Sequence, residues 1–267
     1  MATDIMNFMT EEGVSFHLNT QIVGARDLGT EREILIRKGD STVALRAKAV
    51  LIAVGRTANL KCLGLEEIGI GFERRRLKLD KRLRTTHPHI YAAGDVTGDY
   101  QFTHAAGYEG GVVLGNAILH IPRKVDYSFF PWCTFTDPEL ACIGMNEKMA
   151  TAAGLEYTVY SERFMENDRS LAEGEREGKI KMLLDKKERL LGVQLLGPHA
   201  GDLLAEWVAV MNGGVRLSTL ASSVHPYPTL GEINKKVVTD LFAKKLFSPR
   251  MRKALTLLFN LKGRACG

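Results

Sequence analysis

Within residues 34–55, ILIRKGDSTVALRAKAVLIAVG, apolar and polar residues are mixed as far as Lys48, in a pattern typical of half-buried β-strands. The alternation predicts a strand, a turn at Gly39-Asp40 and a second strand. It then stops, and residues 49–54 are apolar without a break. Such a run predicts a strand covered on both faces, as in a parallel sheet flanked by helices.

Further elements of this region fit an α/β architecture. Residues 4–14 predict a helix, and residues 89–96, HIYAAGDV, predict a short apolar strand that ends in Gly-Asp. Residues 103–120 predict a helix whose small side chains allow close packing on a sheet. A doubly wound nucleotide-binding domain normally opens with a glycine-rich turn that holds a pyrophosphate, and the chain contains no GxGxxG sequence.

The pattern changes after Ile121-Pro122. Residues 127–144 predict a strand and turn, and residues 179–197 alternate in two arms around a charged turn, which predicts a central hairpin. Residues 202–214 predict an amphipathic helix stopped by Gly213-Gly214. The second region is therefore predicted as α+β, an antiparallel sheet with helices.

Residues 224–232, VHPYPTLGE, hold two prolines close together. Proline fixes φ and removes a backbone donor, so this stretch cannot lie inside a helix and is predicted to be stiff and extended or turned. Such a segment either holds functional side chains in place or merely connects two helices.

Composition bounds the class of protein. The 267 residues suffice for two domains, and 45% apolar with 25% charged residues is the mix of a soluble globular protein. No stretch has the roughly 18 uncharged apolar residues that span a bilayer, and the acidic N-terminus differs from a signal peptide, so a cytoplasmic location is expected. The cysteines form no metal-ligand or CxxC spacing, so idle thiols and no metal site are predicted; they are Cys62, Cys133, Cys142 and Cys266.

Positive charge is concentrated at the C-terminus. Residues 233–267 contain nine Lys or Arg and one acid, so they carry +8, whereas the net charge of the whole chain is +5. Leucine and phenylalanine are interleaved with these basic residues. Two interpretations follow: a solvated helix face, or an interfacial helix that makes weak contact with an anionic membrane surface. No nucleic-acid partner is expected.

Five motifs occur in a fixed order along the chain: AVGRTAN, IYAAGDVTG, FTDPELACIG, ENDRSLAEGEREG, and LLGPHAGDLLAEWVAVMNGG followed by HPYPTLGE. In order and spacing they resemble the C-terminal half of the FAD-dependent pyridine nucleotide-disulfide oxidoreductases, which include dihydrolipoamide dehydrogenase and mercuric reductase. The resemblance covers nearly the whole chain.

The resemblance implies an order of parts. Residues 1–54 resemble the C-terminal half of an NAD(P)-binding domain, residues 55–124 the C-terminal segment of an FAD-binding domain, and residues 125–267 a dimerisation domain that forms a homodimer. The implied cofactors are FAD and NAD(P)H. Both would require the missing N-terminal half, because the FAD and NAD fingerprints and the CxxxxC redox disulfide of the family are absent here.

The resemblance also implies cofactor-binding residues. Asp95, preceded by Gly94, would accept hydrogen bonds from ribityl hydroxyls, although an Asp at this point also suits a turn cap. The helix that starts at Thr103 and His104 would point its positive end at the flavin. Gly55 matches a nicotinamide-side contact, although a glycine after an apolar run is also an ordinary turn residue.

Catalytic residues are implied in the 224–232 segment, where the family carries a His-Glu dyad that reaches the partner's redox disulfide. Glu232 matches the glutamate of this dyad, and Tyr227 occupies the position of its histidine. His225 matches an earlier histidine that some dihydrolipoamide dehydrogenases carry. A tyrosine with a pKa near ~10 is a poor base at neutral pH. A tyrosine at this position resembles the mercuric reductases of the family. The paired C-terminal cysteines of those enzymes are absent from this chain, in which Cys266 stands alone. The Tyr227-Pro228 bond is expected to be cis, with Glu232 accepting the Tyr227 hydroxyl proton.

Two functions follow from these expectations. The chain is either part of an FAD-dependent disulfide or metal-ion reductase that is inactive alone, or a truncated, non-catalytic dimerisation module. In both cases a homodimer is expected. The apolar residues of the 202–214 helix exceed what one helix face buries, so they are expected to form its interface; they are Leu203, Leu204, Trp207, Val208 and Val210.

Overall fold

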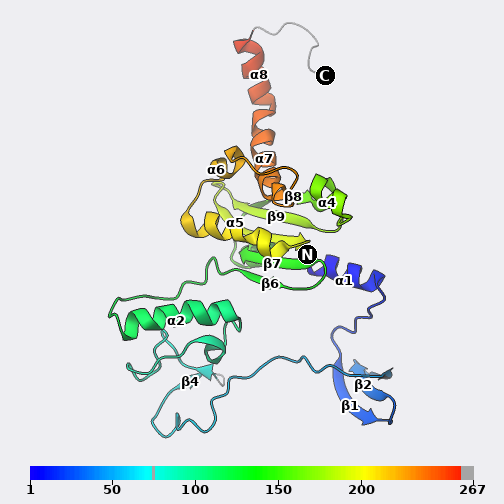
Figure 1. Ribbon diagram of the computed structural model, residues 1–267, viewed down its shortest axis with the longest axis vertical. Helices are drawn as coiled ribbons and strands as arrows, with labels where there is room; N and C mark the ends of the chain where they lie inside the picture. The colour runs from blue at the N-terminus through cyan, green and yellow to red at the C-terminus, as the bar shows by residue number, and fades with distance from the viewer. Residues whose placement is uncertain (74–75, 260–267) are drawn as a thin grey trace. The chain divides into compact units, whose positions relative to one another are not determined.

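The computed structural model describes residues 1–73 and 76–259. The chain divides into two compact units, which are considered separately (Figure 1). Unit 1 contains Met1–Ser15 and Tyr127–Gly267, and unit 2 contains Phe16–Asp126. The mixed α/β composition with antiparallel sheets confirms the predicted fold class.

Unit 1 is built on a five-stranded sheet of order β6-β7-β10-β9-β8, in which every neighbouring pair is antiparallel. Its strands are β6 (Trp132–Thr134), β7 (Glu139–Gly144), β8 (Tyr157–Arg163), β9 (Lys179–Asp185) and β10 (Leu190–Gly197). The hairpin β9-β10 occupies the middle of this sheet, which confirms the prediction for residues 179–197.

Helices cover one face of the sheet and form the main core. These are α5 (Ala200–Gly213), α6 (Leu217–Ser222) and α7 (Glu232–Leu246). Val193 and Leu195 of β10 point into this core with Trp207 of α5 and Val237 of α7, and all four are fully buried. Helix α5 ends where Gly214 adopts the left-handed conformation, as the Gly-Gly pair predicts.

The opposite face of the sheet has a smaller core. Leu140 and Cys142 of β7 and Leu196 of β10 alternate with the residues of the main core, as the period of two in a strand requires. Helix α1 (Ala2–Glu11) packs Ile5 and Phe8 against them, so the predicted N-terminal helix is confirmed. Short elements complete unit 1: α3 (Glu147–Ala152), η2 (Phe164–Glu166), α4 (Asp168–Glu173) and α8 (Pro249–Leu258).

Unit 2 has two small antiparallel sheets. The three-stranded sheet has the order β1 (Gln21–Asp27), β2 (Arg32–Lys38) and β3 (Ser41–Ala47), and the second pairs β4 (Phe72–Glu73) with β5 (Arg76–Leu77). The hairpin β2-β3 confirms the predicted turn at Gly39-Asp40. A 3-10 turn, η1 (Gly94–Thr97), contacts helix α2 (Thr103–Ala117).

Two strand predictions in unit 2 are wrong. Residues 49–54 form no strand, and Leu51, Ile52 and Val54 are 90%, 79% and 83% exposed. Residues 89–96 pair only at the isolated bridge Arg84–Tyr91, and η1 begins at Gly94. A buried strand requires neighbouring strands on both sides, and the described residues provide none for either segment. For the same reason α2 packs against η1 and not against a sheet.

The predicted dimer surface on α5 is also wrong. Leu204, Trp207 and Val210 are 3%, 0% and 6% exposed in the core of their own chain. Leu203 and Val208 pack against the same core. Helix α5 is apolar on more than one side because it contacts the sheet and also packs near α6 and α7, so it needs no second subunit to cover it.

None of the helices in residues 1–73 and 76–259 has the length and hydropathy needed to cross a bilayer.

Candidate functional site

The 224–232 segment connects α6 to α7, and its Tyr227-Pro228 bond is cis, as expected. Tyr227 is 70% exposed, so it is not packed into the core of its own chain. Its hydroxyl donates to Asp168 Oδ2 at 2.7 Å. The expected hydrogen bond from Tyr227 to Glu232 is therefore wrong.

Glu232 instead belongs to the start of α7. Its Oε2 accepts a hydrogen bond from the backbone N–H of Thr229 at 3.3 Å, three residues before the helix begins. The Thr229 hydroxyl donates to the carbonyl of Pro226 at 2.8 Å. The positive end of the helix dipole also stabilises a carboxylate at this position. The start of α7 therefore accounts by itself for the placement of Glu232.

Helix α4 holds Asp168 beside the segment. Asn167 caps α4 by accepting from the N–H of Ser170 at 3.0 Å, and its amide group donates to the carbonyl of Thr229 at 3.2 Å. One side chain therefore fixes the start of α4 to the segment that carries Tyr227. The hydrogen bond to Asp168 and the charge of that carboxylate raise the pKa of Tyr227, so the phenol stays protonated and acts as a donor.

His225 lies on the inner side of the segment, with a side chain that is 13% exposed. Its Nε2 lies 3.0 Å from Glu206 Oε1, and Glu206 Oε2 accepts from the Asn234 amide at 3.0 Å. Asn234 Oδ1 in turn accepts from Trp207 Nε1 at 2.8 Å. His225 therefore belongs to a partly buried polar network that joins α5 to α7, and the structure does not bring it to the Tyr227 hydroxyl.

The second group of expected residues surrounds η1 in unit 2. Gly94 adopts φ +80° and its N–H donates to Glu109 Oε2 at 2.7 Å. Thr97 donates to the carbonyl of Gly94 at 2.9 Å and contacts Glu109 Oε1 at 3.4 Å. Glu109 is fully buried in α2, so one carboxylate fixes the whole turn to this helix.

This arrangement leaves the Asp95 carboxylate at the surface, 47% exposed, with Arg56 Nη1 at 2.8 Å from its Oδ2. Arg56 also donates to the carbonyl of Gln101 at 2.6 Å, just before α2. Thr103 and His104 are exposed in the first turn of α2, where the His104 ring stacks on Phe102. Arg56 thus connects Asp95 to the residues just before α2. Gly55, at φ +101°, faces open space, since a Cβ there would meet no atom within 4 Å.

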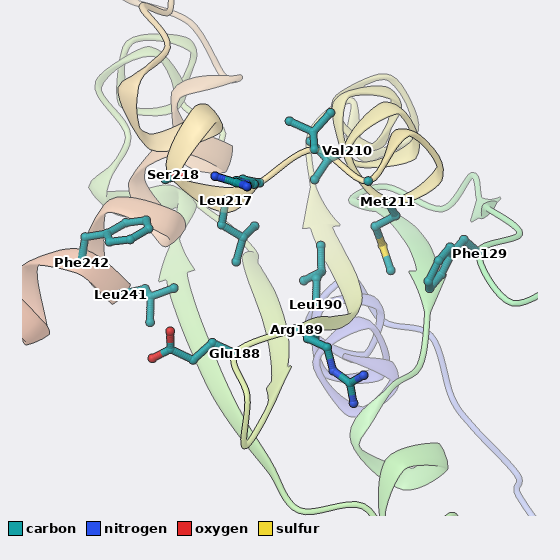
Figure 2. Close-up of a pocket in the computed structure, with 13 residues that line it drawn as sticks. Phe129, Glu188, Arg189, Leu190, Val210, Met211, Leu217, Ser218, Leu241 and Phe242 are labelled. Atoms are coloured by element: carbon teal, nitrogen blue, oxygen red, sulfur yellow. The ribbon is translucent and has the colours of Figure 1, made fainter.

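A groove on unit 1 contains none of the expected catalytic or cofactor-binding residues. Figure 2 shows it between the β9-β10 turn, the end of α5, α6 and α7. Leu190, Leu217 and Leu241 give it an apolar floor, and Glu188 and Arg189 lie at the turn. Within the described residues no group of three or more His, Cys, Asp or Glu side chains is arranged to hold a metal ion.

Burial suppresses the reactivity of two cysteines. It raises the pKa of Cys133 to about 11, with the charge of Glu139 adding to the effect, and raises the pKa of Cys142 to about 12. Cys62 is exposed, and Cys266 lies outside the described residues. The prediction of idle thiols therefore fits Cys133 and Cys142.

Alkylation with iodoacetamide at pH 8 should separate these thiols. We expect Cys62 to be labelled rapidly and Cys133 and Cys142 to be labelled at least about tenfold more slowly, because the thiolate is the reactive form and both pKa values lie far above the pH of the reaction. Peptide mass mapping over time provides the rates, and labelling in denaturant provides the control in which the differences disappear. Equal rates in the folded chain would contradict this assignment.

Sequence reasoning missed Arg56, Glu109, Asp168 and Glu206 as partners of the expected residues. Arg56 and Asp168 lie within AVGRTAN and ENDRSLAEGEREG, so the motifs marked their neighbourhoods without indicating the pairings.

The fold and the two sites define a class of protein. The profile described as pyridine nucleotide-disulphide oxidoreductase matches residues 1–110, and the profile described as the dimerisation domain of the same enzymes matches residues 130–238. The chain belongs to the pyridine nucleotide-disulphide oxidoreductase family.

Individual relatives agree with this assignment. The chain is 34% identical to dihydrolipoyl dehydrogenase of Geobacillus stearothermophilus over 87% of this chain and 50% of that enzyme. It is 32% identical to mercuric reductase of Streptomyces lividans over 88% of this chain and 50% of that enzyme. The Cu(II) complex of the HOCl-induced flavoprotein disulfide reductase RclA from Escherichia coli has a TM-score of 0.80 at 26% identity, covering 90% of this chain and 54% of that one. The chain spans about half the length of the curated relatives it matches.

Proposed function

We propose that the chain is part of an FAD-dependent NAD(P)H:disulfide or metal-ion oxidoreductase, with FAD contacts at η1 and the start of α2. The observation that carries this proposal is the Gly94–Glu109 hydrogen bond, which holds the exposed Asp95 carboxylate next to the first turn of α2. A carboxylate accepts hydrogen bonds from ligand hydroxyls, and the N–H groups in the first turn of a helix favour negative charge. These residues fit a polyhydroxylated cofactor that becomes negatively charged.

FAD, when bound, would accept a hydride from NAD(P)H and deliver an electron pair to a disulfide or metal ion. The residues of this chain would bind and orient it: Asp95 through its carboxylate, Gly94 by allowing close backbone approach, and Thr103 and His104 at the helix start. Arg56 would orient the Asp95 carboxylate through the ion pair between Arg56 Nη1 and Asp95 Oδ2. Gly55 would lie on the nicotinamide side.

Tyr227 would present its hydroxyl oxygen at the substrate site of a homodimer, with its one proton donated to Asp168. Its raised pKa and its bond to Asp168 argue against a role as a base. Glu232 and His225 would act as positioning residues, because Glu232 fixes the start of α7 and His225 anchors the segment to α5.

The proposed parts are residues 1–54 for the NAD(P)-binding half-domain, 55–124 for the FAD-domain segment and 125–267 for the dimerisation domain. Without a CxxxxC pair the chain would not complete the reaction alone. The exposure of Leu51, Ile52 and Val54 favours a second candidate, a non-catalytic dimerisation module whose only extensive core lies in unit 1 among the described residues.

Flavin retention separates these candidates. The chain assembled with an N-terminal half that carries the FAD fingerprint and the CxxxxC pair, mixed with excess FAD and passed through a gel-filtration column, should retain yellow flavin that NAD(P)H bleaches. Asp95→Ala should reduce retention at least about tenfold, because hydrogen bonds to a charged group contribute ~1.5 to 3 kcal/mol. Asp99→Ala is the matched control, since Asp99 is also exposed and paired with an arginine, Arg76, but lies past η1. A colourless dimer at saturating FAD would leave the dimerisation module as the function.

A further inference from the structure

We propose that helix α8 (Pro249–Leu258) binds the surface of an anionic lipid bilayer. The helix contains three basic residues, Arg250, Arg252 and Lys253, and no acidic residue. Within residues 1–73 and 76–259 none of the residues of α8 is buried, and Leu257 and Leu258 are 85% and 75% exposed. Its side chains therefore meet the surroundings of the protein directly, and this inference does not depend on flavin binding.

The two kinds of residue lie on different faces of α8. Met251, Leu255 and Leu258 are separated by four and three residues, a spacing that brings them to one face of an α-helix. Arg250 and Lys253 are separated by three residues and lie on another face. An apolar stripe beside a cationic one matches a helix that lies in a bilayer interface, with its apolar face among the acyl chains and its basic side chains at the headgroups.

The exposed apolar surface begins where α7 leaves the core. Leu241 and Phe242 of α7 still line the groove of unit 1 (Figure 2). One turn later Leu246 and Phe247 are 52% and 71% exposed, and Leu258 at the end of α8 is 75% exposed. Figure 1 shows α8 continuing from α7 away from the five-stranded sheet. The apolar surface is thus displaced from the core and accessible to a flat partner.

Charge and apolarity together select the partner. A nucleic acid would use the basic residues but leave the leucines in water, and a zwitterionic bilayer would use the leucines alone. An anionic bilayer uses both, because its negative surface attracts each nearby Lys or Arg while its acyl chains bury the apolar side chains.

Vesicle co-sedimentation of the full chain tests this proposal. With phosphatidylcholine vesicles that contain phosphatidylglycerol, we expect binding at least about tenfold tighter than with phosphatidylcholine alone. Sodium chloride at about 1 M should remove most of that difference, since it shortens the screening length to ~3 Å. Equal binding to both vesicle types, or no binding to either, would overturn the proposal.

A pair of matched variants tests the orientation of the helix. Leu258→Ser removes a leucine from the apolar face and should weaken binding about tenfold, because serine has almost no apolar side-chain surface to bury among the acyl chains. Leu257→Ser makes the same substitution one residue away, where Leu257 shares a face with Arg250 and Lys253, and should change binding less than about twofold. Equal effects would overturn the proposal. The proposal would also be overturned if the unmodified chain did not sediment with vesicles but formed a larger assembly that Leu258→Ser abolished. In that case α8 would pair with a second copy of the chain.

Discussion

Gly178→Ala should lower the free energy of unfolding of unit 1 by about 3 kcal/mol or more. Gly178 precedes β9 at φ +109°, and a Cβ there would overlap the carbonyl oxygen of Leu196 and lie 3.0 Å from Gly197 Cα. Both contacts are with the backbone of β10, the central strand, which cannot move without disturbing the ladder on each side. Urea unfolding followed by circular dichroism measures the loss.

Gly213→Ala is the control for this experiment. Gly213 ends α5 in the same unit, and a Cβ there meets only Val215 Cγ2 at 3.6 Å, an ordinary contact. Alanine is favoured over glycine within a helix, so this variant should keep or raise stability by up to about 1 kcal/mol. Coincident urea transitions for the two variants would show that β10 tolerates the added methyl group.

Tyr227→Phe, in the assembled enzyme that we propose, should reduce turnover about tenfold or more while the rate of flavin reduction by NAD(P)H changes little. The reason is that the variant removes the hydroxyl group that Asp168 holds in place and leaves the FAD contacts of unit 2 unchanged. Stopped-flow measurement of flavin reduction, combined with steady-state turnover, separates the two steps. Tyr157→Phe provides the comparison, since the Tyr157 hydroxyl bonds to Thr151 at the edge strand β8, away from the 224–232 segment.

Two further observations complete the Tyr227 test. Asp168→Asn removes the negative charge that raises the pKa of Tyr227, so the alkaline limb of the turnover profile should move to lower pH in that variant. Wild-type turnover in Tyr227→Phe would remove the tyrosine from the mechanism.

Elements that depend on short-range sequence were predictable. The β9-β10 hairpin follows from alternation around a charged turn, and the end of α5 follows from Gly213-Gly214. The interruption of helical structure between α6 and α7, at Pro226 and Pro228, is likewise encoded by residues that are neighbours in sequence. In each case the pattern and the structure it specifies lie within one or two elements.

The errors concern partners that are distant in sequence. Apolarity alone predicts a buried strand at residues 49–54, but strands exist only through neighbours that the sequence pattern does not identify. In the sequence, α5 has more apolar residues than one buried helix face requires. The structure explains Leu204 and Trp207 because α5 packs against the sheet and also against other helices. Asp168 lies 59 residues before Tyr227, and no spacing rule connects them.

The exposed segment at residues 50–54 also affects the fate of the chain in concentrated solution. VLIAV has high β propensity, no charge and no proline, which is the composition of segments that stack with identical copies into cross-β assemblies. Lys48 and Arg56 flank it, and like charges at both ends oppose in-register stacking. Arg56 is also the partner of Asp95, so one guanidinium would serve both the cofactor site and the colloidal stability of the chain.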